Sequence, residues 1–236
     1  MLKVLYEDKN ILAIDKPSGI SVHGDGKTDV KTLADFIVED YPEMENIGEP
    51  ILAGEKEIKR PGIVHRLDKD TSGVLLLAKN QEAHEFLKKQ FQTREIKKTY
   101  HAIVSGFIKS DSGVIDKPIG RSPNDFRRRL AGRGARGEMR EAITEYTVLK
   151  RFEDENGEKF SYVEVHPKTG RTHQIRVHMK FLSYPVACDS LYNPGKTCPV
   201  GISRLALHAK SIEFKNLDGK EIKVEAPLPD DFKKYI

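Results

Sequence analysis

The sequence contains no tryptophan and only two cysteines, Cys188 and Cys198. Two cysteines are too few for a disulfide framework, and a chain of 236 residues buries enough surface on folding to need none. We therefore expect both residues to be thiols in a reducing compartment, which predicts a cytoplasmic protein. A CxxC pair is absent, and no carboxylate or cysteine spacing completes a site with the histidines, so the sequence predicts no metal centre.

The sequence also lacks a long hydrophobic run. No window approaches the roughly 18 apolar residues of a membrane-spanning helix. The first residues, MLKVLYEDKN, have neither the apolar core nor the small-residue cleavage site of a signal peptide. We expect a soluble protein with no membrane partner.

Net positive charge is scarce outside one segment. The formal net charge is only +4, but residues 121–140 (RSPNDFRRRLAGRGARGEMR) hold seven arginines against two acids. Arginine makes multidentate contacts with phosphates, and glycine lets the backbone adapt to an irregular partner. The segment could be a solvated mobile loop, but such a cluster favours nucleic-acid binding. The candidate contacts are Arg127, Arg128, Arg129 and Arg133.

Periodicity and turn residues predict a mixed fold. Strands are expected over 4–7, 11–15, 74–77 and 99–104, helices over 30–41, after Asn80 and over 172–182, and a long connection over 42–62. The pairs Asn156-Gly157 and Asp218-Gly219 predict hairpins over 145–166 and 209–226. We expect one α+β (mixed α/β) domain over 1–236, with a largely antiparallel central sheet, flanking helices and a catalytic cleft.

Residues 62–80, GIVHRLDKDTSGVLLLAKN, place a group of charged and polar side chains directly before a strand that is expected to be buried. Loops held by rigid strands often present catalytic groups. Arg66 and Asp68 are two residues apart, so in an extended segment they point to the same side. The pattern alone leaves open whether they form a site or an ordinary ion pair. We expect Asp70 to accept backbone N–H bonds across the following turn.

The run HRLDKDTSG, residues 65–73, resembles the signature of the RluA/RluD class of RNA pseudouridine synthases. Residues 6–17, 98–106, 169–178 and 204–209 resemble further motifs of that class. The resemblance implies the pseudouridine synthase fold and isomerisation of uridine to pseudouridine in ribosomal or transfer RNA. It implies a stand-alone catalytic domain without a separate N-terminal RNA-binding domain, acting as a monomer with no cofactor.

The resemblance also implies roles for individual residues. Asp68 is the essential catalytic carboxylate, and Arg176 is the arginine that favours its ionised form. Tyr100 packs against the uracil, and packing is favoured over proton transfer. The expected contacts with the flipped uridine and its RNA also include Arg66, His65, Arg171 and Ile175. Lys16, before Pro17, is expected either to touch RNA or to be an ordinary surface lysine.

Other functions remain open at this point. Asp68 and Asp70 could form the acid pair of an N-glycosidase-type hydrolase, although residues two apart are poorly placed to flank one bond. The chain could also be an RNA-binding or chaperone module without turnover. Within the synthase hypothesis, Asp68 could attack the sugar, add to the base, or promote elimination to a glycal. The choice between ribosomal and transfer RNA also stays open, with a slight preference for ribosomal RNA.

Overall fold

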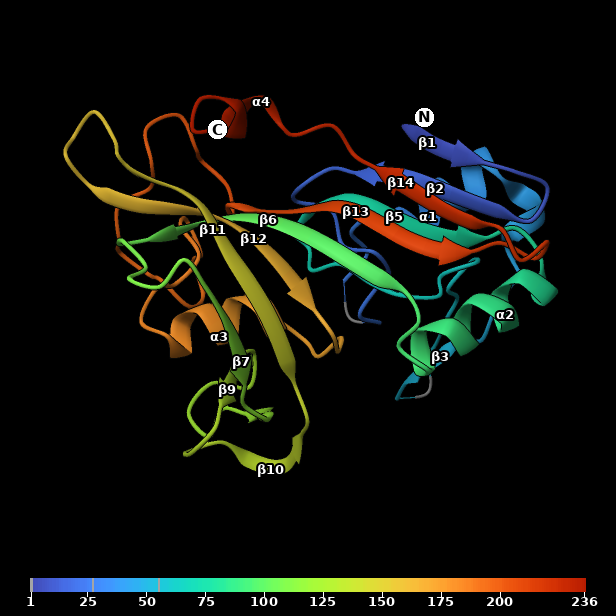
Figure 1. The fold of residues 1–236 in the computed structure, drawn as a ribbon. Coiled ribbons are helices and arrows are strands. Elements are labelled where there is room, and N and C mark those ends of the chain that lie inside the picture. The colour runs from blue at the N-terminus through green and yellow to red at the C-terminus, as the bar shows by residue number, and fades with distance from the viewer. Residues whose placement is uncertain (1, 27, 55) are drawn as a thin grey trace. The chain divides into compact units, whose positions relative to one another are not determined.

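The computed structural model describes residues 2–26, 28–54 and 56–236. The chain divides into two compact units (Figure 1). Unit 1 comprises Met1–Lys97 and Ala209–Pro227, and unit 2 comprises Lys98–His208 and Leu228–Ile236. Unit 1 is therefore built from two stretches of sequence that are separated by more than a hundred residues.

The sheet of unit 1 has the order β1-β2-β5-β13, with β14 paired to β13. Its strands are β1 (Val4–Glu7), β2 (Ile11–Lys16), β5 (Ser72–Ala78), β13 (Leu207–Lys215) and β14 (Glu221–Glu225). The remaining elements are α1 (Leu33–Asp40), the 3-10 helix η1 (Pro42–Met44), α2 (Gln81–Gln92), and a hairpin of β3 (Ile51–Ala53) and β4 (Lys56–Ile58).

Strand β5 is buried along its whole length, as its continuous apolar run predicts. Helix α2 follows directly and adds Ala83 and Leu87 to the core that contains Leu76 of β5. The helix begins where Asn80 caps it, with the side-chain oxygen accepting the N–H of Ala83 at 2.9 Å. The end of β5 therefore lies in the core, and the loop before β5 is anchored to it.

The main sheet of unit 2 has the order β6-β12-β11-β7. Its strands are β6 (Lys97–Ser105), β12 (Lys159–Pro167), β11 (Ile143–Glu153) and β7 (Ser112–Asp116), and its helices are α3 (Gln174–Phe181) and α4 (Asp230–Lys233). A second, small sheet has the order β10-β8-β9, from β8 (Ile119–Arg121), β9 (Arg129–Ala131) and β10 (Arg136–Arg140). The arginine-rich segment is thus partly strand, not simply a mobile loop.

The expected fold class is confirmed. The strand pairings β1–β2 and β2–β5 in unit 1, and β6–β12, β12–β11 and β11–β7 in unit 2, are antiparallel. Both predicted hairpins form. The helix expected from residue 30 begins at Leu33, because Thr32 and Asp35 form a capping box there. The expected connection over 42–62 contains η1 and the β3–β4 hairpin. Among the described residues, no helix is long and apolar enough to cross a membrane.

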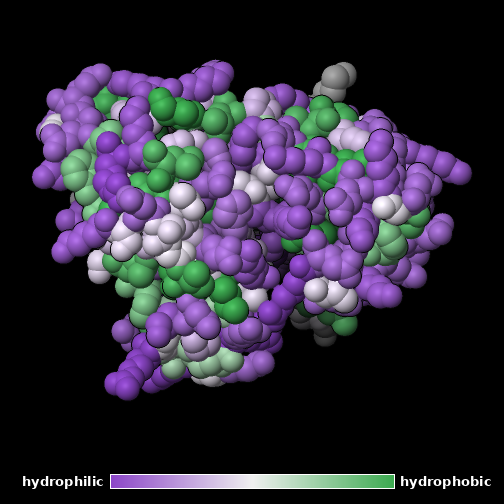
Figure 2. All heavy atoms as spheres, in the orientation of Figure 1, coloured by the Kyte–Doolittle hydropathy of each residue, from purple (hydrophilic) through white to green (hydrophobic). Residues whose placement is uncertain are grey.

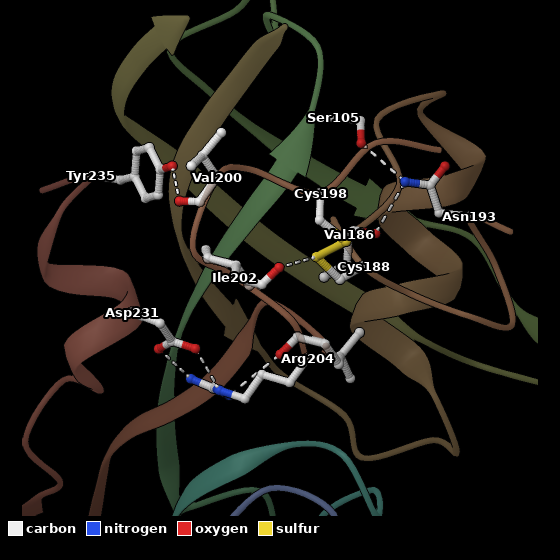
Figure 3. The surroundings of a disulfide bond; sticks show 11 residues. Ser105, Val186, Cys188, Asn193, Cys198, Val200, Ile202, Arg204, Asp231 and Tyr235 are labelled. Atoms are coloured by element: carbon white, nitrogen blue, oxygen red, sulfur yellow. Dashed lines mark hydrogen bonds and ion pairs between the residues drawn. A yellow bond between two sulfur atoms is a disulfide. The ribbon is translucent and has the colours of Figure 1, made fainter. Parts of the chain in front are cut away.

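The two cysteines differ from expectation. Cys188 and Cys198 form a disulfide, with their Cα atoms 5.1 Å apart (Figure 3). The Sγ atom of Cys188 lies 3.5 Å from the carbonyl oxygen of Ile202. The expectation of two thiols was therefore wrong, because the turn between the two residues returns the chain to the same place. Nearby, Arg204 forms a bidentate ion pair with Asp231 at 2.8 and 2.9 Å (Figure 3).

Candidate functional site

The loop that carries Asp68 is braced by the segment that follows β2. The N–H of Gly19 donates to the carbonyl oxygen of Lys69 at 3.0 Å. The hydroxyl of Ser18 donates to the carbonyl oxygen of Asp70 at 2.7 Å. Because both bonds end on main-chain atoms next to Asp68, they restrain the backbone of this loop. The half-buried Asp68 side chain is thus presented from a fixed backbone.

Lys16 is completely buried beneath this loop. Its Nζ atom donates to the carbonyl oxygens of Pro17 at 2.8 Å and Lys69 at 2.9 Å. Burial lowers the pKa of Lys16 to about 8, although the negative charges of Asp70 and Asp68 oppose the shift. The expectation that Lys16 touches RNA or lies at the surface was wrong. The lysine ties the end of β2 to the Asp68 loop instead.

Arg60 and His23 both interact electrostatically with Arg66, which is exposed. Burial lowers the pKa of Arg60, and the charge of Arg66 lowers it further. The pKa of His23 is likewise lowered by burial and by both arginines. Since a lowered pKa keeps the His23 imidazole neutral at neutral pH, Arg60 and Arg66 supply the positive charge in this part of unit 1. Such a region favours an anionic ligand.

His65 and Asp70 have local structural roles. The Nε2 atom of His65 accepts the N–H of Leu76 at 2.9 Å, and its ring stacks on Phe91 with centroids 4.7 Å apart. These contacts hold the start of the motif against β5 and α2. The expectation for Asp70 was wrong, because within the described chain its carboxylate accepts no backbone N–H, while its main-chain carbonyl accepts the Ser18 hydroxyl.

Gly73 lets β5 approach the neighbouring strand β13. Its φ is +110°, and an added Cβ would collide with the main-chain carbonyl oxygen of Ala209. Only glycine adopts such a backbone without strain. The glycine that closes the HRLDKDTSG run is thus required by packing.

In unit 2, Arg176 of α3 is buried and held by an acid that the sequence analysis missed. Its Nε and Nη2 atoms donate to the two carboxylate oxygens of Asp189 at 2.7 and 2.9 Å. Asp189 also accepts the N–H groups of Leu191 and Tyr192, each at 2.9 Å. The guanidinium is therefore fixed in orientation. Asp68 belongs to unit 1, so its pairing with Arg176 stays a prediction.

Tyr100 and Ile175 lie in the same part of unit 2. Tyr100 is half-buried on β6 and packs against the core that contains Ile175. Lys98 lies two residues before Tyr100 on β6, and its Nζ atom donates to the carbonyl oxygen of Thr169 at 3.3 Å. Burial lowers the pKa of Lys98 to about 8. The motifs of residues 98–106 and 169–178 therefore meet in this unit.

The turn before α3 is organised by Gln174. Its Oε1 atom accepts the N–H of Arg171 at 3.0 Å and the hydroxyl of Thr169 at 2.6 Å. Its Nε2 atom donates to the carbonyl oxygen of Ile143 at 3.0 Å. Arg171 itself donates from Nε to the carbonyl oxygen of Glu141 at 2.9 Å. The position of Arg171 at the surface is thus set by a buried amide.

A basic pocket of about 460 Å³ lies between this turn and the small sheet. The arginines that line it are Arg121, Arg129, Arg136, Arg140 and Arg171. Glu138 also lines it and is bonded to Arg140 at 3.0 and 3.2 Å, so the pocket keeps a net positive charge. The hydroxyl of Tyr192 accepts the N–H of Arg129 and is hydrogen-bonded to Nδ1 of His173, both at 2.9 Å. Tyr192 therefore joins the arginine-rich segment to the motif of residues 169–178.

The predicted arginines are not equivalent. Arg129 lines the pocket, whereas Arg127 forms a bidentate pair with Asp125 at 2.8 and 3.0 Å, which lowers the pKa of Asp125 to about 2. Arg128 is half-buried, 3.6 Å from Asp125, and Arg133 is exposed. The pocket residues Arg121, Arg136 and Arg140 were not among the predicted contacts, because charge density along the chain does not reveal which side chains converge. The hydrophilic side chains of the small sheet lie at the lower end of the view in Figure 2.

No group of three or more histidine, cysteine, aspartate or glutamate side chains able to hold a metal ion occurs among the described residues. Of the candidate reactive groups, the carboxylate of Asp68 belongs to unit 1, and the phenol of Tyr100 and the guanidinium of Arg176 belong to unit 2. A carboxylate or a phenol can take part in acid–base chemistry, and a carboxylate can also act as a nucleophile.

Comparison with known proteins agrees with the motifs. The family model described as RNA pseudouridylate synthase matches residues 10–181. The uncharacterized RNA pseudouridine synthase YlyB of Bacillus subtilis is 39% identical over 236 residues, covering 100% of this chain and 72% of the relative. The ribosomal large subunit pseudouridine synthase D of Pseudomonas aeruginosa is 39% identical over 98% of this chain and 69% of its own. A solved structure, human RNA pseudouridylate synthase domain containing 1, matches with a TM-score of 0.75 and 26% identity, over 97% of this chain and 84% of that one.

Proposed function

Since the chain belongs to the RluA/RluD class of RNA pseudouridine synthases, it is an isomerase that acts on RNA, and we propose that it converts specific uridines of a structured RNA through Asp68. The observation that carries this proposal is the bracing of the Asp68 loop by the buried Lys16 and by Ser18. A catalytic carboxylate has to be held in a fixed geometry, and this loop is tied to a buried strand at both of its ends.

The reaction is an isomerisation without a redox step. The bond between uracil N1 and the sugar carbon breaks, the base rotates, and carbon 5 bonds to the same sugar carbon. Carbon 5 then loses a proton and N1 gains one, so atoms and electrons balance without a cofactor. An ionised Asp68 can attack the sugar carbon, add to the base, or promote elimination to a glycal.

Tyr100 and Arg176 are proposed to act in the same reaction. The half-buried ring of Tyr100 supports a packing role against the uracil, because stacking on an aromatic ring contributes about 1–3 kcal/mol per base. Arg176 is oriented by Asp189 on two of its donor atoms. This fixed orientation supports a role in presenting positive charge to the reacting groups.

The target uridine has to leave its helix at a cost of a few kcal/mol. Phosphate contacts offset this cost, and the arginine pocket of unit 2 and the cations around Arg66 are suited to supply them. Arg66 is proposed to guide the flipped base. One relative is named for the ribosomal large subunit, which favours large-subunit ribosomal RNA as the substrate.

The test compares Asp68→Asn with Asp70→Asn. Pseudouridines are mapped in total RNA from cells that lack the gene and carry either variant, and turnover is measured with purified protein on an RNA that the mapping identifies. We expect Asp68→Asn to lower turnover roughly a thousandfold or more while RNA binding persists. Asp70→Asn should keep most of its activity, since its carboxylate has no hydrogen-bonded partner in the described chain.

The same experiment separates the alternatives. An RNA chaperone would tolerate Asp68→Asn, whereas an acid-pair hydrolase would lose activity with either variant and would leave abasic sites in the RNA. Full pseudouridine formation by Asp68→Asn would contradict the proposal.

A further inference from the structure

The most exposed large apolar side chain in the described part of the protein belongs to Phe126. It is 87% exposed and lies in the loop between β8 and β9, within the arginine-rich segment. A single exposed apolar residue needs no explanation by itself. The surroundings of this ring are what distinguish it.

The loop under Phe126 is closed by its own hydrogen bonds. The N–H of Ser122 donates to the carbonyl oxygen of Arg128 at 3.1 Å, and the N–H of Arg128 donates to the carbonyl oxygen of Asp125 at 2.9 Å. Nη1 of Arg129 donates to the carbonyl oxygen of Phe126 itself at 3.1 Å. Because the backbone is held on both sides, the ring is presented to solvent at little further cost in ordering.

The same contact connects Phe126 to the basic pocket. Arg129 bonds the main chain of Phe126 and also lines the pocket with Arg121 and Arg136. In the described residues, no acid pairs with Arg121 or Arg136. An aromatic platform beside a pocket of net positive charge is the combination that binds single-stranded nucleic acid, in which bases stack and phosphates are held electrostatically.

We propose that Phe126 stacks on an unpaired nucleobase of the RNA while the arginine pocket binds the adjoining phosphates. This base is distinct from the reacting uridine, which is assigned above to Asp68 and Tyr100. The inference rests on the proposed function only in that the substrate is RNA. A protein partner is disfavoured, because an apolar pocket on a partner would have to meet a single ring surrounded by arginines.

The absence of tryptophan from the chain provides a direct test. The Phe126→Trp variant carries a single tryptophan, and the emission of this tryptophan, excited selectively over the eight tyrosines, is followed during titration with a short RNA hairpin that has an unpaired loop. Emission is expected to be quenched at saturation, since a stacked base contacts the indole face. A matched Val114→Trp variant, at a position that is 65% exposed on β7, should respond little.

Affinity provides the second measurement. Phe126→Ala should bind the hairpin roughly 5- to 150-fold more weakly than the wild type, with an unchanged salt dependence, because no charge is lost. Its affinity for a fully paired duplex of the same length should change little. Val114→Ala is the matched control for both RNAs. Both positions are exposed, so the variants should fold.

Equal hairpin affinities for Phe126→Ala and the wild type would overturn the inference. Quenching of Phe126→Trp by anionic lipid vesicles but not by the hairpin would overturn it in favour of a lipid contact. If the wild type forms pseudouridine and binds the hairpin while Phe126→Ala behaves identically, only this inference fails. If the wild type binds no RNA, the proposed function fails with it.

Discussion

Replacement of Lys16 by methionine separates the positioning of Asp68 from the stability of the fold. Methionine nearly matches the volume of the lysine stem but cannot donate to the carbonyl oxygens of Pro17 and Lys69. The Asp68 loop would keep its hydrogen bonds with Ser18 and Gly19 but lose the hydrogen bond that Lys16 donates to the carbonyl oxygen of Lys69. We expect a folded protein with a slow reaction.

The magnitude follows from two opposing effects. The carbonyl oxygen of Lys69 keeps the N–H of Gly19, so only the carbonyl of Pro17 loses its donor, at a cost of about 1–3 kcal/mol. Against this, Lys16→Met removes a buried charge whose penalty, read from the fall in pKa from 10.5 to about 8, is about 3.5 kcal/mol at roughly 1.4 kcal/mol per pKa unit. The free energy of unfolding at neutral pH should therefore stay nearly the same or rise by no more than about 2.5 kcal/mol.

The assay compares kcat and KM on an RNA substrate with urea unfolding of the same preparations. A shift of the loop by about 1 Å should lower kcat about 100-fold with little change in KM. Lys69→Met is the control, since the Lys69 side chain is exposed and only its carbonyl is used. A folded Lys16→Met variant that turned over at the wild-type kcat would refute the reasoning.

Stability against pH checks the burial of the lysine independently. The pKa of Lys16 is lower in the folded state than in the unfolded state, so its titration favours folding at high pH. This contribution is absent at neutral pH, appears as the pH rises through 8, and is complete above 10.5. The wild type should therefore gain stability relative to Lys16→Met over this interval. A constant difference would contradict the burial of a charged lysine.

Two further predictions concern the pocket and the glycine after the motif. Arg136→Gln should weaken RNA binding and reduce the slope of log affinity against log salt by about 1. Arg127→Gln should change this slope less, because Asp125 already compensates the charge of Arg127. Equal slopes for the two variants would contradict the assignment of Arg136 to phosphate binding. Gly73→Ala should destabilise unit 1 by more than about 2 kcal/mol in urea unfolding, because strain and a backbone collision combine. Gly219→Ala, at φ +77° with open space around it, should cost only about 1–2 kcal/mol.

Local signals predicted much of the fold. The apolar run of β5, the Asn80 cap and the Asn156-Gly157 turn each depend on neighbours in the sequence, and each formed as expected. The start of α1 was misjudged because Val30 was counted in the apolar stripe, although the Thr32 capping box ends the extended segment later. Propensity therefore located the elements, and capping chemistry set their ends.

The support of the candidate site was largely hidden, because it depends on contacts distant in sequence. Asp189 holds Arg176 from 13 residues away, across a turn with no periodic pattern. Lys16 follows a buried strand, and its burial depends on carbonyls 1 and 53 residues away. Composition alone could not distinguish the arginines of the pocket from Arg127. Arg136 of the small sheet and Arg171 come together only when the chain folds. The motifs in the sequence therefore identified the candidate site residues, but not the residues that hold them in place.

The shared hydroxyl of Tyr192 limits how the arginine-rich segment can change in evolution or engineering. A segment transplanted from a relative would need to present a backbone N–H at the position of Arg129, or the Tyr192 hydroxyl, which also bonds His173 next to α3, would lose that donor. We therefore expect that replacing this segment by itself will not transfer RNA specificity. Residues 189–193 have to be replaced together with it. The two stretches would have to be exchanged as one unit, although Arg129 and Tyr192 are 63 positions apart in the chain.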